Sequence, residues 1–198
     1  MKASLKTTIV FGIIIFCSFL GFSQNSNSFH KKYVIILDIQ KEYTENSMLD
    51  SFSQKLIDSI NFVIENTDAD RIIYVKSFHK LLNLSFSFPP IYVSIDTSAK
   101  WDLDSRMNLV NENIISKEES NVFKVKELTN YLDQNNAKEI IVIGLMAEQC
   151  VYKSLLGGKE LGYKMFTIPS AIAWESQKNK EKTINALKLK GITFMQPE

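Results

Sequence analysis

Runs of apolar, mostly β-branched residues recur along the chain, separated by stretches whose apolar positions have helical spacing. Tyr33-Val-Ile-Ile-Leu37 and Arg71-Ile-Ile-Tyr-Val75 are nearly continuous apolar runs, as is typical of strands buried on both faces. Further strands are predicted over residues 112–116, 139–144, 164–168 and 192–195. Helices are predicted over residues 47–66, 119–134, 149–161 and 175–189. Residues 77–110, interrupted by Pro89-Pro90, are predicted to be irregular.

Strands that alternate with helices predict a parallel sheet, because a parallel connection needs a crossover that is usually helical. We therefore expect an α/β fold, a three-layer α/β/α Rossmann-like sandwich with a mostly parallel six-stranded sheet. The 198 residues suffice for one such domain and are too few for two. Ligands of these sheets bind beyond the carboxyl ends of the strands. Asp38, Lys117 and Gly144 end or follow predicted strands, and Cys150 comes shortly after Gly144, so they are expected at one edge.

The first residues differ in pattern from the rest of the chain. Lys2 and Lys6 precede an apolar stretch, Ile9–Phe22, that is shorter than the ~20 residues of a membrane-spanning helix. Gly21-Phe22-Ser23 then has the small-x-small pattern that a signal peptidase accepts. The expected organisation is a signal peptide at 1–23, a polar spacer at 24–32 and one domain at 33–198. The mature protein is accordingly expected to be exported, periplasmic or secreted, with no membrane association after cleavage.

Charge, cysteine content and glycine spacing limit the nucleic-acid partners, disulfides and nucleotide cofactors that can be expected. The formal net charge is +1, from 23 Lys plus Arg against 22 Asp plus Glu, which gives no electrostatic reason to expect nucleic acid. Signal cleavage would remove Cys17, so Cys150 would be the only thiol and no internal disulfide is expected. No Gly-x-Gly-x-x-Gly follows the first predicted strand, so no nucleotide cofactor is expected.

Taken singly, the polar residues at the expected edge have both structural and functional interpretations. Cys150 lies near the start of a predicted helix, where unpaired amides and the helix dipole are expected to lower a thiol pKa. A buried structural cysteine is the common alternative. Asp38 can face the crevice or cap a turn, and a lone Lys117 is most often a solvated surface charge.

Taken together, these residues lie in three motifs that resemble those of the isochorismatase-like cysteine hydrolases. Leu37-Asp-Ile-Gln-Lys-Glu-Tyr43 resembles the first motif, an apolar strand followed by Asp-x-Gln-x-x-Phe. Lys117-Glu-Glu-Ser-Asn-Val-Phe123 resembles the second, and Ile143-Gly-Leu-Met-Ala-Glu-Gln-Cys-Val151 the third. The order and spacing of all three agree, and the resemblance covers about residues 33–196.

The resemblance implies a catalytic triad. Asp38 would be the general base, Lys117 would offset the negative charge, and Cys150 would attack a carbonyl to form a thioester. The backbone N–H groups of Met146 and Cys150 would form the oxyanion hole. The substrate-pocket candidates are Gln40, Tyr43 and Phe123.

The implied activity is that of an exported hydrolase that cleaves a small amide or related acyl substrate at a non-peptide C–N bond. The alternative is a catalytically inactive isochorismatase-like domain that serves as an exported binding or assembly module. Family members commonly assemble as dimers or larger oligomers, so the resemblance also implies a homo-oligomer. The expected partner is a small-molecule substrate.

One departure from the family concerns metal. Nicotinamidases of this family carry an Asp and His cluster after the second strand that holds a metal ion. Here that stretch is Ser77-Phe78-His79-Lys80, and the only other histidine is His30. Because a metal site needs more ligands than this, we expect no metal and no other cofactor.

Overall fold

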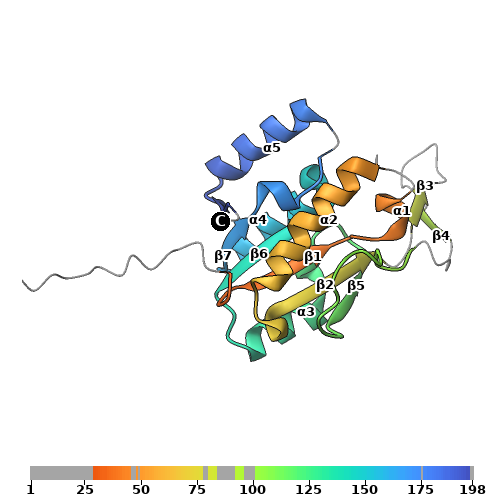
Figure 1. Ribbon diagram of the computed structural model, residues 1–198. Coiled ribbons are helices and arrows are strands. Elements are labelled where there is room, and N and C mark those ends of the chain that lie inside the picture. The colour runs from red at the N-terminus through yellow and green to blue at the C-terminus, as the bar shows by residue number, and fades with distance from the viewer. Residues whose placement is uncertain are drawn as a thin grey trace, which may run out of the picture.

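The computed structural model describes residues 29–45, 48, 50–77, 80–83, 92–95, 101–174 and 176–196. Its main sheet has six parallel strands in the order β5-β2-β1-β6-β7-β8 (Figure 1). The strands are β1 (Tyr33–Leu37), β2 (Ile72–Ser77), β5 (Ile114–Lys117), β6 (Glu139–Gly144), β7 (Lys164–Thr167) and β8 (Thr193–Phe194). The expected α/β fold with a parallel six-stranded sheet is confirmed.

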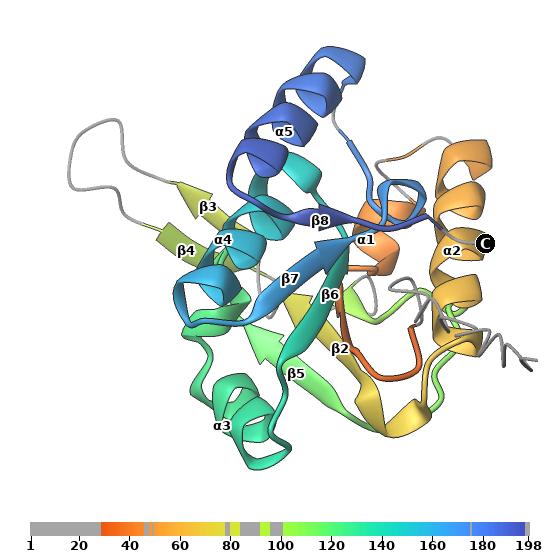
Figure 2. The same cartoon turned by 90° about the vertical axis from the view of Figure 1, so that its left-hand side faces the viewer.

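Helices cover both faces of this sheet, as right-handed crossovers between parallel strands require. The α-helices are α1 (Lys41–Thr44), α2 (Asp50–Glu65), α3 (Lys126–Gln134), α4 (Tyr152–Glu160) and α5 (Gln177–Leu189). Figure 2 shows α2 on one face and α3 and α4 on the other. The short helices are the 3-10 turns η1 (Ala69–Arg71), η3 (Val122–Lys124) and η5 (Pro169–Ala171), and the π-helical turn η4 (Ala147–Val151).

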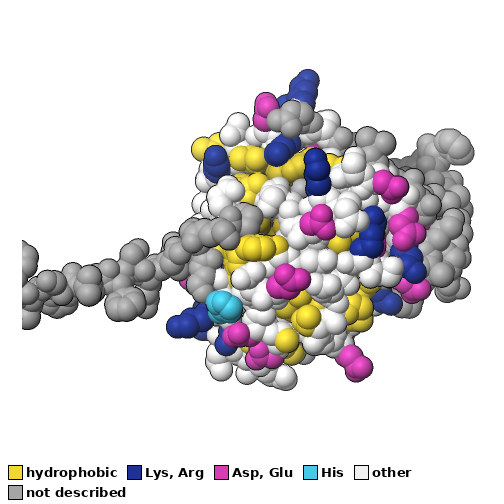
Figure 3. Space-filling model, viewed as in Figure 1, with side chains coloured by type: hydrophobic (Ala, Val, Ile, Leu, Met, Phe, Trp, Pro, Cys, Tyr) yellow, Lys and Arg dark blue, Asp and Glu magenta, His cyan; other side chains and the backbone are white. Residues whose placement is uncertain are grey.

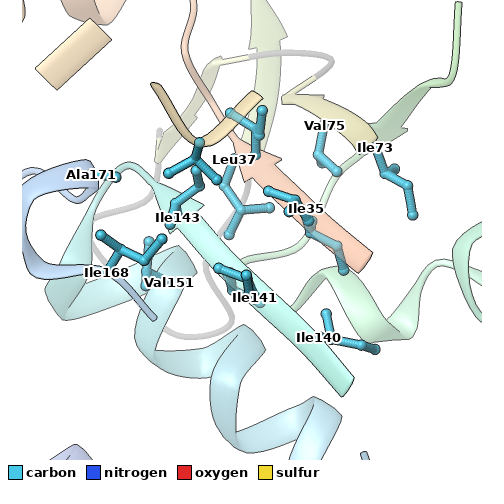
Figure 4. Packing of buried hydrophobic residues seen from close by; sticks show 14 of the residues in the cluster. Ile35, Leu37, Ile73, Val75, Ile140, Ile141, Ile143, Val151, Ile168 and Ala171 are labelled. Atoms are coloured by element: carbon cyan, nitrogen blue, oxygen red, sulfur yellow. The ribbon is translucent and has the colours of Figure 1, made fainter. Parts of the chain in front are cut away.

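The centre of the core is formed by β1 and β6. All five residues of β1 are buried, and Ile35, Leu37, Ile141, Ile143 and Val151 belong to one cluster of buried apolar side chains that extends over both faces of the sheet (Figure 4). Burying one such side chain fully contributes about 1.5–3 kcal/mol. Continuous apolar runs are therefore required here, because both faces of each strand are covered by helices.

Two regions differ from the prediction. The segment expected to be irregular contains β3 (Lys80–Asn83) and β4 (Tyr92–Ile95), which form a separate antiparallel two-stranded sheet. The predicted Pro89-Pro90 break lies outside the described residues. The helix predicted from 119 begins only at Lys126, because η3, capped by the Asn121 side chain, comes first.

The domain begins before β1. Phe29, within the expected spacer, is 7% exposed and packs edge-to-face on Phe62, with ring centroids 6.5 Å apart. Lys32 is also buried. Residues 1–23 lie outside the described part of the chain, so the signal peptide stays a prediction.

The length of the described helices and the distribution of surface charge are relevant to the expectation of no membrane and no nucleic-acid partner. Among the described residues, no helix is both long and apolar enough to cross a membrane. On the face seen in Figure 3, basic and acidic side chains are interspersed. No patch of a single charge sign dominates the described residues of that face.

Candidate active site

The carboxyl ends of four strands bring Asp38, Ser77, Lys117 and Cys150 together. Lys117 ends β5 and lies in register with Ser77, which ends β2. Asp38 directly follows β1, and the chain leaving β6 enters the π-helical turn that holds Cys150. The strand order reverses between β1 and β6, with β2 and β5 to one side and β7 and β8 to the other. Open α/β sheets bind ligands at such a switch point.

The ammonium of Lys117 lies at the centre of these side chains. Its Nζ is 2.9 Å from Asp38 Oδ2 and 3.4 Å from Cys150 Sγ. It also donates a 3.1 Å hydrogen bond to Ser77 Oγ, which in turn donates to Asp38 Oδ1 at 2.8 Å. The side chains of Lys117 and Asp38 are only 3% and 5% exposed, so the ion pair is shielded from water. The three residues of the predicted triad are thus in one cluster.

Ser77 was not identified by sequence analysis as a member of this cluster. Its hydroxyl both accepts from Lys117 and donates to Asp38, so it fixes the orientation of the carboxylate relative to the ammonium. A serine has no distinctive motif. The only signal in the sequence was its place two residues after the strand predicted over residues 71–75, near the edge where parallel neighbours also end; the observed β2 extends to Ser77.

Asp38 has an unusual backbone conformation for a residue with a side chain. Its φ is 58°, in the left-handed region, which costs a non-glycine residue about 1–2 kcal/mol. The Asp38 N–H donates to the Val75 carbonyl at 2.9 Å, so the residue is still tied to β2. This left-handed conformation ends β1 at Leu37, and the Asp38 carboxylate contacts Lys117 just beyond the end of the strand.

Gly144 at the end of β6 is required by a close approach of backbones. Its φ is +113°, and a Cβ atom at this position would lie 2.1 Å from the Leu37 carbonyl oxygen. Any side chain here would push β6 away from β1. Glycine therefore lets the chain turn tightly out of the sheet and into the turn that carries Cys150.

The backbone after Gly144 leaves the Met146 amide group without an acceptor in the described part of the chain. Leu145 N–H donates to Leu37 O, and Ala147 N–H donates to Ala173 O, both at 2.9 Å. Between them, the Met146 N–H donates to no acceptor in the described part of the chain. It is one of the two amides, with that of Cys150, that the resemblance assigns to an oxyanion hole, and it is free to donate to a ligand.

Gln40 lies behind the cluster and is fully buried. Its Nε2 donates to Trp101 O at 2.6 Å and to Ser77 O at 3.2 Å, and its Oε1 accepts from Ser77 N–H at 2.8 Å. Gln40 therefore holds the end of β2, including Ser77, rather than lining an open pocket.

The two aromatic pocket candidates differ in position. Tyr43 stacks edge-to-face on Trp101, with ring centroids 5.9 Å apart. Burial, together with the neighbouring Asp38 and Cys150 groups, raises the pKa of the Tyr43 hydroxyl to about 12, and this hydroxyl therefore lies beside the cluster. Phe123 is 6% exposed and packs on Tyr163, with ring centroids 5.6 Å apart. Phe123 is therefore a core residue in this arrangement.

The ionisation of Cys150 differs from the prediction. Burial raises the pKa of the thiol, Asp38 raises it further, and Lys117 only partly opposes them. The pKa lowering expected from the start of a helix is therefore wrong. Burial alone would lower the pKa of Lys117, but Asp38 and Cys150 outweigh it and the net direction is upward. At neutral pH Lys117 is therefore an ammonium and Cys150 a protonated thiol.

The described side chains near the site do not supply a set of metal ligands. Within the described ranges, no group of three His, Cys, Asp or Glu side chains could hold a metal ion. Ser77 occupies the start of the stretch where the nicotinamidases carry metal ligands, and His79 lies outside the described residues. The described donor set therefore does not fit a metal site of that kind.

Comparisons with known proteins agree with this fold. The family model of the Isochorismatase domain matches residues 32–198. The fold is similar to pyrazinamidase of Pyrococcus horikoshii in complex with zinc (20% identity, TM-score 0.65, 84% of this chain and 99% of that chain covered). It is also similar to N-carbamoylsarcosine amidase from Thermoplasma acidophilum (16%, 0.67, 85% and 97%). A third is the YcaC gene product of Escherichia coli, an octameric hydrolase of unknown specificity (14%, 0.63, 84% and 75%).

At these identities the structural matches show a shared fold. No curated protein matches the chain significantly in sequence. The family model, by contrast, covers nearly all of the described residues and includes all three motifs. It confirms the resemblance found in the sequence and the hydrolase class that it implied. The chain belongs to the isochorismatase family.

Proposed function

We propose that this protein is a cysteine hydrolase that cleaves a small amide, or a related acyl compound, through a thioester on Cys150. The observation that carries the proposal is the buried Lys117 ammonium in contact with both the Asp38 carboxylate and the Cys150 sulfur. Removing two charges from water costs several kcal/mol per ion, and a purely structural cysteine needs no ion pair beside it. Buried charges beside a nucleophile are instead typical of catalytic sites.

In the acylation step, the Asp38 carboxylate accepts the thiol proton as Cys150 Sγ attacks the carbonyl carbon. A base is needed because the pKa of the thiol is raised. Lys117 stabilises the developing thiolate, and the Met146 and Cys150 N–H groups donate to the oxyanion. The C–N bond then breaks, the amine or ammonia takes the proton from Asp38, and a thioester remains.

In the deacylation step, water attacks the thioester carbonyl while Asp38 accepts a proton from it. The C–S bond breaks, the carboxylic acid leaves, and the proton returns to the Cys150 sulfur. Ser77 keeps the Asp38 carboxylate in place during both proton transfers. The enzyme ends each cycle with the proton distribution with which it began.

The substrate class is supported by the family and by two of the fold relatives, whose names describe a pyrazinamidase and an N-carbamoylsarcosine amidase. Both names denote the hydrolysis of small amide-type compounds. Tyr43, beside Asp38 and Cys150, adds one aromatic surface to the site. An aromatic ring of this kind suits a planar or short acyl group.

The test is ammonia release from nicotinamide, pyrazinamide, N-carbamoyl amino acids and short aliphatic amides. We expect turnover by the wild-type protein and a loss of about 10³-fold or more in Cys150→Ala. Acid-quenched samples should also show the acyl group on the wild-type chain by intact mass. Turnover that survives in Cys150→Ala would overturn the thioester. Binding of an amide without turnover would favour the alternative, an inactive binding module.

We also propose that the protein is exported and assembles as a homo-oligomer. The basic start and apolar stretch of residues 1–23 support export, and the octameric Escherichia coli relative supports assembly. Amino-terminal sequencing of protein recovered from the producing cell should begin at Gln24. Light scattering of the same material should give a mass that is a multiple of the mature chain.

A further inference from the structure

Residues 101–107, here called the strap, run beside the residues that follow β1. Asp104 N–H donates to Ile39 O at 2.9 Å, and Lys41 N–H donates to Asp102 O at 3.0 Å. The strap also accepts the 2.6 Å hydrogen bond from the Gln40 side chain. These bonds join segments about sixty positions apart in the chain and cover the edge of the site from Asp38 to Thr44.

Asp104 links the strap to α1 through its side chain, which is 1% exposed as a residue. Arg106 binds this carboxylate through Nη2 at 2.6 Å and Nε at 3.0 Å, and Thr44 Oγ1 donates to it at 2.6 Å. Burial alone would raise the pKa of Asp104, but the hydrogen bonds from Arg106 and Thr44 outweigh it and lower the pKa. Asp104 is therefore a fully bonded carboxylate at neutral pH.

The strap lies where the backbone of Asp38 needs support. A left-handed conformation at a non-glycine residue persists only when its surroundings hold it. Upstream, Asp38 is held by β1 and by its N–H bond to Val75 O. Downstream, it is held through Ile39 and Gln40, both of which the strap binds.

We infer that Asp104 is a positioning residue for Asp38, acting through Thr44 and the strap to keep the Asp38 carboxylate on Lys117 and beside Cys150. The inference rests on the proposed function, because it assigns Asp104 a part in holding the proposed base. Asp104 itself touches none of the three residues of the predicted triad. Its effect on the reaction is through the backbone that it anchors.

The ionisation of Cys150 reports where Asp38 lies, because the Asp38 charge raises the pKa of that thiol. If the carboxylate moves away from the sulfur, the thiol ionises at lower pH. The rate of alkylation by iodoacetamide as a function of pH measures this midpoint, and it does so whether or not a substrate is known.

The experiment uses the full chain with Cys17→Ser, so that Cys150 is the only thiol. The variants are Asp38→Asn, Asp104→Asn, Thr44→Val and the double variant Asp38→Asn with Asp104→Asn. Glu139→Gln is the matched control, since Glu139 also pairs with lysines but at the opposite end of the sheet. Melting temperature is recorded for every variant.

Asp38→Asn is expected to lower the midpoint, and Asp104→Asn and Thr44→Val to lower it by about 0.5 pH unit or more. The double variant should match Asp38→Asn alone, because the effect of Asp104 passes through Asp38. With a substrate in hand, kcat in Asp104→Asn should fall about tenfold with KM within about threefold. Glu139→Gln should lower the melting temperature without moving the midpoint.

The inference is overturned if Asp38→Asn moves the midpoint while Asp104→Asn and Thr44→Val do not, a result that leaves the proposed function intact. If Asp38→Asn leaves the midpoint in place, the coupled thiol itself is refuted, and the proposed function fails together with the inference. Should Asp104→Asn fail to fold, Thr44→Val decides the outcome. That change removes one hydroxyl and retains the bonds between Asp104 and Arg106.

Discussion

Both ends of the parallel sheet hold a buried lysine paired with a carboxylate. At the carboxyl end, Lys117 lies 2.9 Å from Asp38, and the side chains are 3% and 5% exposed. At the amino end, Lys32 lies 3.4 Å from Glu139, whose side chain is 35% exposed and is shared with Lys164 at 2.8 Å. Among the described residues, Asp38 has one ammonium partner in a dry site, whereas Glu139 has two and keeps contact with water.

The surroundings of the two pairs explain this difference. At the amino end, Lys32 and Lys164 lie over the Phe166 ring, 5.0 and 5.1 Å from its centroid, and so cover the end of the core. At the carboxyl end, the pair lies beside a thiol and a left-handed Asp38, features that do not favour stability. A buried ion pair alone therefore does not mark a site. Here the carboxyl-end pair differs from the amino-end pair by the left-handed backbone of Asp38 and the thiol of Cys150 beside it.

The largest expected contrast between the two ends concerns glycines with positive φ. Gly144→Ala should cost about 4 kcal/mol or more, or prevent folding, because its Cβ would lie 2.1 Å from Leu37 O. Gly162 lies just before the amino end of β7, and a Cβ atom on Gly162 would meet nothing within 4 Å. Gly162→Ala should therefore cost only about 1–2 kcal/mol, from backbone strain alone. Urea unfolding measures both. Equal losses would contradict the close approach of β1 and β6.

The next contrast replaces each lysine by methionine. Lys117→Met leaves Asp38 buried without a cationic partner and should cost about 3–5 kcal/mol of stability. It should also reduce amide hydrolysis by about 10²-fold or more. Lys32→Met should cost only about 1 kcal/mol, because Glu139 keeps Lys164 and some water.

Urea unfolding and ammonia release, measured on the same two preparations, check this second contrast. Activity in Lys32→Met should stay within about threefold of the wild type. A Lys32→Met variant as inactive as Lys117→Met would show that both pairs act only by stabilising the fold.

Within the carboxyl end, the two charges should move the thiol in opposite directions. Asp38 raises the pKa of Cys150, so Asp38→Asn should lower the alkylation midpoint by about 1 pH unit. Lys117 lowers it, so Lys117→Met should raise the midpoint by a similar amount. Asparagine tolerates positive φ, so the backbone at 38 should persist. Shifts of the same sign would show a distortion of the site rather than the loss of one charge.

The smallest expected effect appears at alkaline pH. The pKa of Tyr43 is raised to about 12, so in the unfolded chain it ionises from about pH 10 while in the folded protein it stays neutral. The contribution of Tyr43 to the free energy of unfolding is therefore fully present below about pH 10 and is lost as the pH rises toward 12. Tyr43→Phe should lose less stability than the wild type over this window in urea unfolding.

Tyr163 provides the comparison for that measurement. Its pKa is also raised to about 12, by burial and by its solvent-exposed hydrogen bond to Asp133. Because water screens that bond, Tyr163→Phe should change the alkaline loss less than Tyr43→Phe does. If Tyr163→Phe instead changed the alkaline loss of stability more than Tyr43→Phe, the surroundings of Tyr163 would resist its ionisation more strongly than those of Tyr43, contrary to this prediction.

The sequence by itself determined the sheet and the edge at which the candidate site lies. Buried strands such as β1 and β6 can be predicted from local sequence alone, because a strand that is buried on both faces consists of consecutive apolar residues. Since parallel strands end at one edge, these runs are enough to place Asp38, Lys117 and Cys150 at the same edge of the sheet, and the resemblance to the family implied that they form one site. The family match over residues 32–198 confirms the resemblance that these motifs carried.

Only the tertiary structure decided which groups surround those residues. Ser77 meets Asp38 across 39 positions, and Thr44 meets Asp104 across 60, and no local pattern in the sequence predicts either contact. The upward pKa of Cys150 likewise depends on desolvation and on a carboxylate supplied by another strand, and neither can be read from its own helix. Periodicity is a property of neighbouring residues, whereas burial and charge proximity are set by the whole fold.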